Sequence, residues 1–589
     1  MTASLFKSAR DDDYGDLWRD YWRSRWHAIP DWSETSRFHA LLSAEEGRRQ
    51  SSPLVYDYPK GTRPFLGVLS KSGGWEASHE AGVLEFPSAG HLLTIAPTRT
   101  GKGVSQIIPN LLFYGGSAFV IDVKGENYDI TADHRATMFP GSKVLKFSPF
   151  ENKTDRYNPL DFVRTDIGGG PTDDTFEDCR LLAEMLLPKT NAGHKDEYWD
   201  IEARNVLAAI LMAVVSLHDY GSRERNMRSV VQTLFSEDQD DDHKGIVKEF
   251  HAIQKLAQRI DYGPLKALAT AVLEHGDKVL SNILSTCRAG MQIWLSERLL
   301  KATEVSDFKF SDLKKSMCRP IEDDPAPTTL YVIIPPEYLS EYRSVLRMMT
   351  GLAAVELTRL GDWVDEPGWR RKPPCSVLFL LDEFPSLGEM KPIANGLAYL
   401  AGYGVQLWTF AQNIGQLKHI YGEAWQNFPA NAGATSFFGV NDPDTAAYVE
   451  RLLGETQEVL QHYYARGYRN KGSFTDTHGT SSSRGTSHGT SSSNVPRPND
   501  VMQQGRNSGD SRSSGSSASS ANSINIEVEE DRINHRYTKW QIATASEVRS
   551  MPDPLQLVFI RNQKPILATK LPHYQFELLN GLYSTWKRG

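Results

Sequence analysis

The sequence has few cysteines, no excess of positive charge and no long hydrophobic run. Only four cysteines occur among the 589 residues, and no two of them form a CxxC pair: Cys179, Cys287, Cys318 and Cys375. This spacing argues against a disulfide framework and against a zinc site, so we expect buried or incidental thiols. Acidic residues outnumber basic ones by 73 to 65, and the net charge is -8. That balance argues against a protein that simply coats duplex DNA, although a ring could confine positive charge to its channel.

The sequence also has no segment that is expected to cross a membrane. No stretch approaches the roughly 18 consecutive apolar residues that a membrane helix needs. The longest apolar run, residues 206–217, is interrupted by Ser216 and predicts a core helix. The N-terminus has no basic segment followed by an apolar block, so we expect no secretory signal and a cytoplasmic chain. A length of 589 residues predicts two or more packed units.

Strand-like and helix-like segments alternate from about Gly90 onwards. Residues 91–97 are a short apolar segment typical of a strand, residues 104–115 have the spacing of a helix, and residues 117–125 again resemble a strand. This βαβ order predicts a parallel sheet. Five later segments are predicted as further strands: 143–150, 328–335, 375–383, 405–412 and 434–440. We therefore expect an α/β domain.

The segment between the first strand and its helix, APTRTGKGV, is close to a phosphate-binding P-loop. In such a loop, backbone N–H groups and a helix N-terminus face the phosphates, while a lysine reaches the outer ones. The pattern GxxxxGK[ST] has glycine and a hydroxyl at the positions where this chain has Ala96 and Gly103. We predict that the whole loop binds nucleotide, with the lysine also acting in catalysis: Ala96, Pro97, Thr98, Arg99, Thr100, Gly101, Lys102, Gly103 and Val104.

Polar side chains end two of the later predicted strands. Asp382 and Glu383 directly follow an apolar strand, Val377–Leu381. Carboxylates at this edge of a parallel sheet face a bound nucleotide, so Asp382 is a candidate ligand of Mg²⁺ and Glu383 a candidate base for the attacking water. A solvent-exposed acidic turn is the alternative. Gln412 ends another predicted strand, where its amide could sense hydrolysis of the γ-phosphate.

These motifs, in this order and spacing, closely resemble the TraG-like coupling proteins of type IV secretion and conjugation. The resemblance extends from about residue 85 to residue 575 and includes IIPNLL after the P-loop, DVKGEN, LLDEFPSLG and FAQNIGQL. In that family APTRxGKGV is the usual form of the P-loop, so a glycine after the lysine is expected. Carried over residue by residue, the family motifs fall on Gly101, Lys102 and Gly103 for nucleotide binding, on Asp382 and Glu383 for the acidic motif, and on Gln412 for the glutamine motif.

The resemblance implies a RecA-like ATPase that binds ATP and Mg²⁺ and assembles as a homo-hexameric ring. Such a ring receives single-stranded DNA with its relaxase, or secreted protein substrates, and feeds them to the channel subunits of a type IV secretion system. Its fold is an α/β P-loop NTPase domain with a mainly parallel sheet, interrupted by an all-α insertion domain. Ring ATPases commonly use an arginine from the neighbouring subunit, and we favour Arg288 over Arg343 and Arg347 for that role.

The composition divides the chain into six regions. The nucleotide-binding domain is expected at 61–164, 326–465 and 529–589, the all-α insertion at 165–325, a disordered Ser/Gly-rich insert at 466–528, and a Trp/Arg-rich region at 1–60. The insert is too polar to bury a core. The Trp/Arg-rich region is expected to pack as an amphipathic helix or to dock on a partner or membrane surface. Residues 556–570 predict a β-hairpin that turns at 561–564 and forms a sheet edge.

One departure from the family concerns the membrane. Members commonly begin with transmembrane helices, and we predict none in this sequence. The chain therefore either docks on channel subunits, with indirect contact to the inner membrane, or belongs to a soluble branch with another task. Two other functions stay open: a soluble DNA translocase that is not tied to secretion, and a nucleotide-binding platform that recruits effector proteins with little turnover.

Overall fold

The structure of the protein is a computed structural model. It describes residues 63–69, 82–86, 88–187, 193–216, 224–236, 242–314, 326–359, 375–470, 527–575, 579 and 581–584. The Trp/Arg-rich region 1–60 and most of the Ser/Gly-rich insert lie outside these residues. Contacts divide the chain into a first unit, Met1–Gly454 with Gln541–Gly589, and a second unit, Glu455–Trp540.

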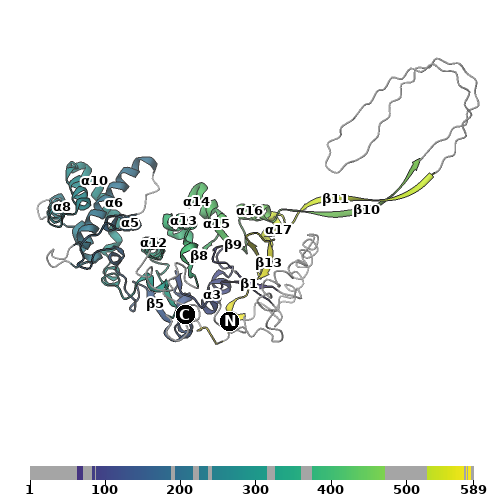
Figure 1. Cartoon of the computed structure of the whole chain (residues 1–589), viewed down its shortest axis with the longest axis horizontal. Coiled ribbons are helices and arrows are strands. Elements are labelled where there is room, and N and C mark those ends of the chain that lie inside the picture. The colour runs from purple at the N-terminus through teal and green to yellow at the C-terminus, as the bar shows by residue number, and fades with distance from the viewer. Residues whose placement is uncertain are drawn as a thin grey trace, which may run out of the picture. The chain divides into compact units, whose positions relative to one another are not determined.

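The first unit is built on one large sheet. Its described strands are β1 (Phe65–Leu69), β2 (Gly82–Glu85), β3 (His91–Ile95), β4 (Ala118–Ile121), β5 (Lys143–Phe147), β6 (Thr328–Val332), β7 (Val377–Leu381), β8 (Val405–Ala411), β9 (Ala432–Phe437), β12 (Leu555–Ile560) and β13 (Ile566–Thr569). They form an 11-stranded sheet in the order β2-β1-β13-β12-β9-β3-β8-β7-β4-β6-β5 (Figure 1). Non-consecutive strands are neighbours, as expected when helices connect parallel strands.

The half of the sheet from β5 to β9 is parallel throughout. Every residue of β3, β4, β6, β7 and β8 is buried, because helices cover both faces of the sheet. This burial explains why these strands are uninterrupted apolar runs in the sequence. The predicted α/β fold with a mainly parallel sheet is confirmed.

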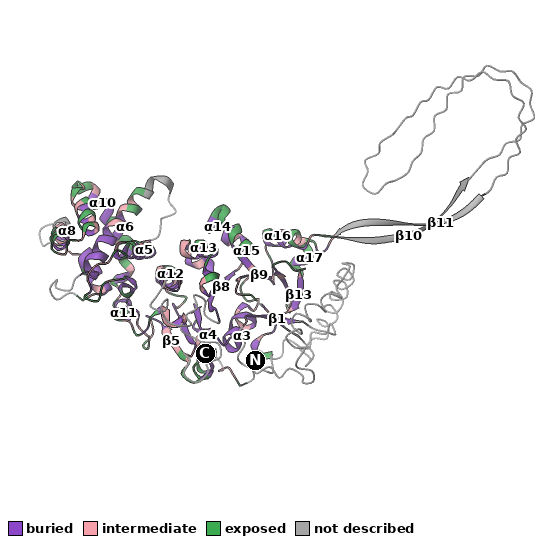
Figure 2. Cartoon of the chain, viewed as in Figure 1, coloured by how far each residue is buried: buried purple, intermediate pink, exposed green. Residues whose placement is uncertain are grey.

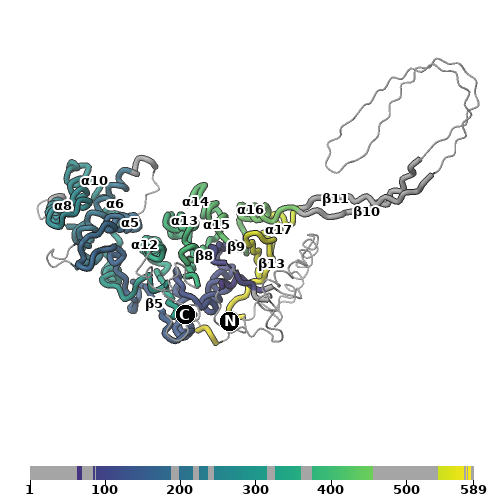
Figure 3. Tube along the Cα trace, in the orientation of Figure 1, coloured from purple at the N-terminus to yellow at the C-terminus, as the bar shows by residue number. Residues whose placement is uncertain are grey.

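The other half of the sheet is antiparallel and joins the two ends of the described chain. β12 and β13 form the predicted hairpin, but β13 pairs with β1, and β1 pairs with β2. The prediction that the hairpin forms a sheet edge is therefore wrong, since β1 and β2 extend the sheet beyond it. Figure 3 shows the yellow C-terminal strands beside the purple segment with which the described part of the chain begins. The Asn110 side chain fixes β1 by bonding both the N–H (2.7 Å) and the carbonyl (2.8 Å) of Phe65.

Alternate residues of the central strands point to opposite faces of the sheet. Phe119 and Ile121 belong to the larger hydrophobic core, whereas Ala118 and Val120 belong to a second core with Ile107. The larger core lies under α12 (Leu339–Glu356), α13 (Lys391–Gly396) and α14 (Ile414–Tyr421), and α3 (Ile108–Phe113) and α4 (Glu126–Thr137) lie on the other side (Figures 1 and 2). The predicted P-loop is thus framed by a sheet with helices on both faces.

Within the described residues of the region predicted as an all-α insertion, the regular elements are helices, and the β-structure is limited to an isolated bridge between Thr165 and Pro171. The helices are α5 (Thr175–Leu186), α6 (Gly193–Val215), α7 (Met227–Leu234), α8 (Asp242–Arg259), α9 (Gly263–Glu274), α10 (Asp277–Met291) and α11 (Glu297–Ala302). α6 is the buried centre of this group (Figure 2), and α5 contacts α12 beside the sheet. No helix within the described ranges has the length and apolar character of a membrane span.

The cysteines differ from one another. Cys179 and Cys287 are buried free thiols in the helical region, and burial raises the pKa of both, of Cys287 to about 12. Cys375 takes part in a disulfide, so the expectation of incidental thiols is wrong for this residue. No group of three or more metal-ligating side chains occurs in the part of the chain that the structure describes.

The second unit has its own two-stranded sheet, formed by β10 (Glu455–Asn470) and β11 (Glu527–Gln541). The predicted boundaries at 465/466 and 528/529 therefore fall inside these strands, and the contact boundaries lie at 454/455 and 540/541. Each strand pairs with a partner on the far side of the Ser/Gly-rich segment, and local composition does not reveal such a pairing.

Candidate nucleotide site

The P-loop connects the end of β3 to the N-terminus of a helix. Ala96 extends the β3–β8 pairing, because its N–H donates to the Ala411 carbonyl at 2.9 Å. The chain then turns through positive φ angles of 63° at Arg99 and 93° at Gly101. A π-helical turn, Gly103–Ile107, follows and continues directly into α3. The predicted frame of strand, loop and helix is present, with the loop at the carboxyl edge of the parallel strands.

Lys102 is held at this edge by two oxygen atoms. Its ammonium donates to the Ala96 carbonyl at 2.9 Å and lies 3.7 Å from a carboxylate oxygen of Glu383. Only 8% of its side chain is exposed. A buried cation in this position carries the charge that a P-loop directs at phosphate oxygens.

The acidic pair follows β7, between β4 and β8. The Glu383 N–H donates to a carboxylate oxygen of Asp382 at 3.0 Å. The Gln412 amide, at the end of β8, donates to the second carboxylate oxygen of Glu383 at 2.9 Å. The structure thus brings together Lys102, Glu383 and Gln412, three of the four residues predicted to be catalytic, around one carboxylate.

Two carboxyl groups, the buried one of Asp122 and the partly buried one of Asp382, follow neighbouring strands of the sheet. Burial, reinforced by Glu383, raises the pKa of Asp382 to about 6, although Lys102 lowers it. Burial also raises the pKa of Asp122 to about 7, with a further contribution from Asp382. Asp122 belongs to the DVKGEN segment and accepts a hydrogen bond from the Tyr128 N–H at 2.8 Å, but no role was predicted for it from the sequence. A divalent cation would offset the cost of this buried negative charge.

The residues present fit nucleotide with Mg²⁺. Magnesium usually takes one or two protein carboxylates and completes its shell with phosphate oxygens and water, so Asp382 suffices as the protein ligand. Gly103 offers no hydroxyl, and a Cβ at this position would meet no atom within 4 Å, so packing does not require glycine there. The nearby hydroxyls donate to loop carbonyls: that of Ser105 to Gly101 at 2.6 Å and that of Thr100 to Pro97 at 2.7 Å.

The C-terminal part of the chain supports the loop from outside. The buried ammonium of Lys570, just after β13, donates to the Thr100 carbonyl at 2.7 Å and lies 4.7 Å from the centre of the Phe438 ring. His573 places a ring nitrogen 3.3 Å from the Val104 carbonyl. Sequence reasoning missed both residues. The one local signal was a lysine directly after an apolar strand, and its partner lies some 470 positions earlier.

Within one chain, Arg288 does not contact the P-loop, the acidic pair or Gln412. It lies on α10, where its guanidinium donates to the Leu234 carbonyl at 3.1 Å and sits 6.0 Å from the centre of the Phe235 ring. Its predicted action on a neighbouring subunit stays a prediction. Arg343 and Arg347, the weaker candidates, lie on α12.

Comparison with known proteins agrees with this geometry. The family model described as "Type IV secretory system Conjugative DNA transfer" matches residues 52–503. Protein VirD4 of Rhizobium radiobacter is 30% identical over 420 residues, which covers 70% of this chain and 54% of that protein. Conjugal transfer protein TraG of Escherichia coli is 28% identical over 408 residues, covering 67% and 60%. The chain therefore spans little more than half the length of these curated relatives.

Solved structures share the fold. The bacterial conjugative coupling protein TrwBdeltaN70, in complex with sulphate, superimposes with a TM-score of 0.52 at 15% identity, covering 82% of this chain and 85% of that one. The plasmid coupling protein TrwB in complex with ADP and Mg²⁺ gives a TM-score of 0.51, also at 15% identity, covering 82% and 85%. Because the family model covers well over half of the sequence, this chain belongs to the type IV secretory system conjugative DNA transfer family.

Proposed function

We propose that this chain is the ATP-hydrolysing coupling protein of a type IV secretion or conjugation system. The observation that carries the proposal is the Glu383 carboxylate, which lies 3.7 Å from the ammonium of Lys102 and 2.9 Å from the amide of Gln412 at the carboxyl edge of a parallel sheet. A buried cation, a base and an amide that positions the base are the parts that phosphoryl transfer to water requires.

Each residue has a separate task in this proposal. When bound, ATP would supply the reactive phosphoanhydride, and Mg²⁺ would supply a positive charge that draws electrons from the γ-phosphorus. Glu383 accepts the proton of the attacking water on a carboxylate oxygen, while Gln412 holds the other oxygen in place. Lys102 neutralises negative charge beside the P-loop, and Asp382 contributes the protein's ligand to the metal.

We further propose a homo-hexameric ring that receives single-stranded DNA with a relaxase, or secreted proteins, and passes them to secretion channel subunits. Membership of the family and the names of the relatives, VirD4 and TraG, support this role. Contact with the inner membrane would then be indirect, through channel partners. In the ring, Arg288 would stabilise charge at the neighbouring subunit's nucleotide.

The test is steady-state ATP hydrolysis by the full-length chain, with and without single-stranded DNA, at several protein concentrations. We expect DNA to stimulate turnover and the rate to rise more than linearly with protein concentration, because the ring must assemble. Lys102→Ala and Glu383→Gln should each lower kcat by at least about 100-fold. Glu423→Gln, at an exposed glutamate, is the matched control and should leave the rate unchanged.

Three results would contradict the proposal in different ways. Full turnover by Glu383→Gln would show that Glu383 is not the base that accepts the proton of the attacking water. Nucleotide binding without turnover in any condition would favour a recruitment platform. DNA-stimulated turnover by a chain that binds no secretion subunit would favour a translocase that is not tied to secretion.

A further inference from the structure

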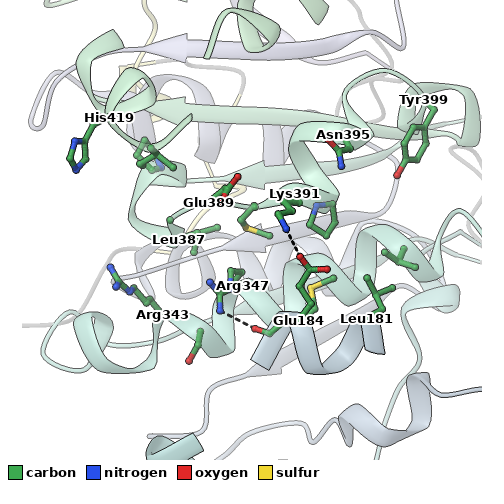
Figure 4. Close-up of a pocket in the computed structure, with 18 residues that line it drawn as sticks. Leu181, Glu184, Arg343, Arg347, Leu387, Glu389, Lys391, Asn395, Tyr399 and His419 are labelled. Carbon is green, nitrogen blue, oxygen red and sulfur yellow. Dashed lines mark hydrogen bonds and ion pairs between the residues drawn. The ribbon is translucent and has the colours of Figure 1, made fainter. Parts of the chain in front are cut away.

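A cavity of about 690 Å³ lies between the all-α region and the segment that follows the acidic pair. Its walls come from α5, α12, residues 385–392 and α14 (Figure 4). No P-loop residue lines it, and the hydrolysis proposed above does not use it. One wall begins only two residues after Glu383.

Two arginines one helical turn apart on α12 line this cavity. Arg347 exposes only 9% of its surface, and one of its terminal nitrogens donates to the Met185 carbonyl at 3.0 Å. Its Nε is buried and has no hydrogen-bond partner. Arg343 is exposed and forms no hydrogen bond or ion pair with any residue that the structure describes. Figure 4 shows the two side chains next to each other along the helix.

The other charged groups around the cavity do not neutralise this pair. Lys391 and Glu184 form an ion pair at 2.6 Å, so they largely cancel each other. Glu389 adds one negative charge to the lining, so the three cations Arg343, Arg347 and Lys391 exceed the two carboxylates Glu184 and Glu389 by one charge. The arginine pair therefore leaves an excess of positive charge at one end of the cavity.

The protein's own electrostatics agree with this excess. Burial, reinforced by the neighbouring guanidinium groups of Arg343 and Arg204, lowers the pKa of Arg347 to about 10, while Glu184 acts in the opposite direction. Arg204 also has a buried terminal nitrogen without a hydrogen-bond partner. An anion in the cavity would relieve this repulsion, because guanidinium groups bind oxyanions through paired N–H donors.

The opposite end of the cavity carries an aromatic ring. Tyr399 is 45% exposed and lines the cavity, away from the arginine pair in Figure 4. Nucleic-acid bases stack on exposed aromatic rings while cationic side chains hold the phosphates. The volume lies within the range of ordinary small-ligand sites, about 300–1,000 Å³. The arrangement suits one nucleotide, with its phosphate at the arginines and its base at Tyr399.

We propose that this cavity binds a nucleotide unit through its phosphate group, and that the unit belongs to single-stranded DNA or is a free mononucleotide. The DNA source rests on the proposed function. Occupation of the cavity acts on residues 385–392, and through them on Glu383, because the segment is continuous with the acidic pair. Arg343 and Arg347 bind the phosphate, and Tyr399 stacks on the base.

The test uses the full-length chain and fluorescence anisotropy with a labelled single-stranded oligo-dT over a series of salt concentrations. Arg343→Gln and Tyr399→Ala should each weaken binding by about 10-fold. For Arg343→Gln the slope of log affinity against log salt should also become shallower by about 0.7. Arg347→Lys keeps the charge but loses the planar fork, and it should weaken binding less. Arg549→Gln, at an exposed arginine outside the cavity, is the matched control and should change nothing.

A second arm separates the two sources. Calorimetric titration of AMP into the Lys102→Ala protein reports binding outside the P-loop. The same titration is then carried out on the double variant, which combines Lys102→Ala with Arg343→Gln. Loss of oligo-dT affinity assigns the cavity to DNA, and loss of AMP binding alone assigns it to a free mononucleotide. The proposal is overturned if the cavity variants bind both probes as the unsubstituted chain does, or if neither probe binds. If the unsubstituted chain hydrolyses ATP and binds oligo-dT, and the cavity variants bind oligo-dT and AMP with the same affinity as that chain, this inference is refuted. The proposed function is then left intact.

Discussion

At the scale of single residues, the backbone of Glu383 is strained. Its φ of 51° and ψ of 37° lie in the left-handed region, which costs a residue with a Cβ roughly 1–2 kcal/mol. Strain of this kind persists only where the surrounding structure imposes it. Here the conformation holds the carboxylate between Lys102 and Gln412. The strained backbone therefore lowers the stability of the fold but fixes the position of the proposed base.

This strain predicts an unusual order of stabilities. Glu383→Gly should be more stable than Glu383→Ala by roughly 1 kcal/mol, because glycine adopts positive φ without a steric penalty. At an ordinary position the order would be the reverse. Both variants should lose turnover, since both lose the carboxylate. Urea unfolding of the two proteins measures the difference, and an alanine variant at least as stable as the glycine variant would show that the backbone is not strained.

A second residue makes stability depend on pH. His91, at the start of β3, exposes 2% of its surface, and its Nδ1 accepts the Leu407 N–H at 3.1 Å. Burial lowers the pKa of His91 from 6.5 to about 4. Between these values the unfolded chain binds a proton that the folded chain does not bind, so stability is lost as pH falls through this window.

His91→Asn should reduce this acid sensitivity, because asparagine keeps an acceptor and does not titrate. The folding free energy linked to His91 is on the order of 3 kcal/mol between neutral pH and pH 4. We expect the Tm of the unsubstituted chain to fall more than that of the variant over this range. Parallel thermal melts at a series of pH values measure this, and curves that stay parallel would exclude His91 as the cause.

At the scale of elements, the hairpin of β12 and β13 is both a pair of sheet strands and a support for the P-loop. Lys570 reaches the Thr100 carbonyl at 2.7 Å. Gly439, just after β9, has a φ of 59°, and a Cβ there would lie 2.4 Å from the Thr100 side chain. The loop is therefore held from two directions by segments that are distant in the sequence.

Lys570→Met should loosen this support and weaken the binding of a non-hydrolysable ATP analogue by about 10-fold, because a hydrogen bond to a charged group contributes about 1.5–3 kcal/mol. Lys564→Met, in the exposed hairpin turn, is the matched control and should bind normally. Equilibrium titration with a fluorescent analogue gives both affinities. An unchanged dissociation constant for Lys570→Met would mean that the P-loop keeps its conformation without this contact.

The same elements show why only part of the fold and of the site follows from the sequence. A strand such as Val377–Leu381 is buried on both faces and is therefore a recognisable apolar run. Parallel strands end at one edge, so Lys102, Glu383 and Gln412 could be expected to meet. In contrast, β1 and β2 are short and depend on Asn110 and on β13. The contact from Lys570 depends on the same distant pairing, which no local pattern encodes.

At the scale of the whole molecule, the chain leaves the first unit and returns to it at two neighbouring places in that unit. The chain leaves the first unit after Gly454 and returns at Gln541. The Ile542 N–H donates to the Gly454 carbonyl at 3.0 Å, so the residues that flank the second unit are already adjacent. A short linker can span this gap without distorting either end, and closing a short loop costs little entropy.

Replacement of residues 455–540 by a short Gly/Ser linker should therefore leave the first unit folded. Its sheet and its nucleotide site lie outside the replaced segment, so Tm and basal ATP turnover should stay close to those of the full chain. The contrasting variant replaces residues 175–302, whose helices share the larger hydrophobic core with the sheet, and it should fail to fold. If instead the shortened chain keeps its Tm but loses the more-than-linear rise of turnover with protein concentration, the second unit acts in assembly of the ring. Loss of Tm would show that the first unit depends on the second for its fold.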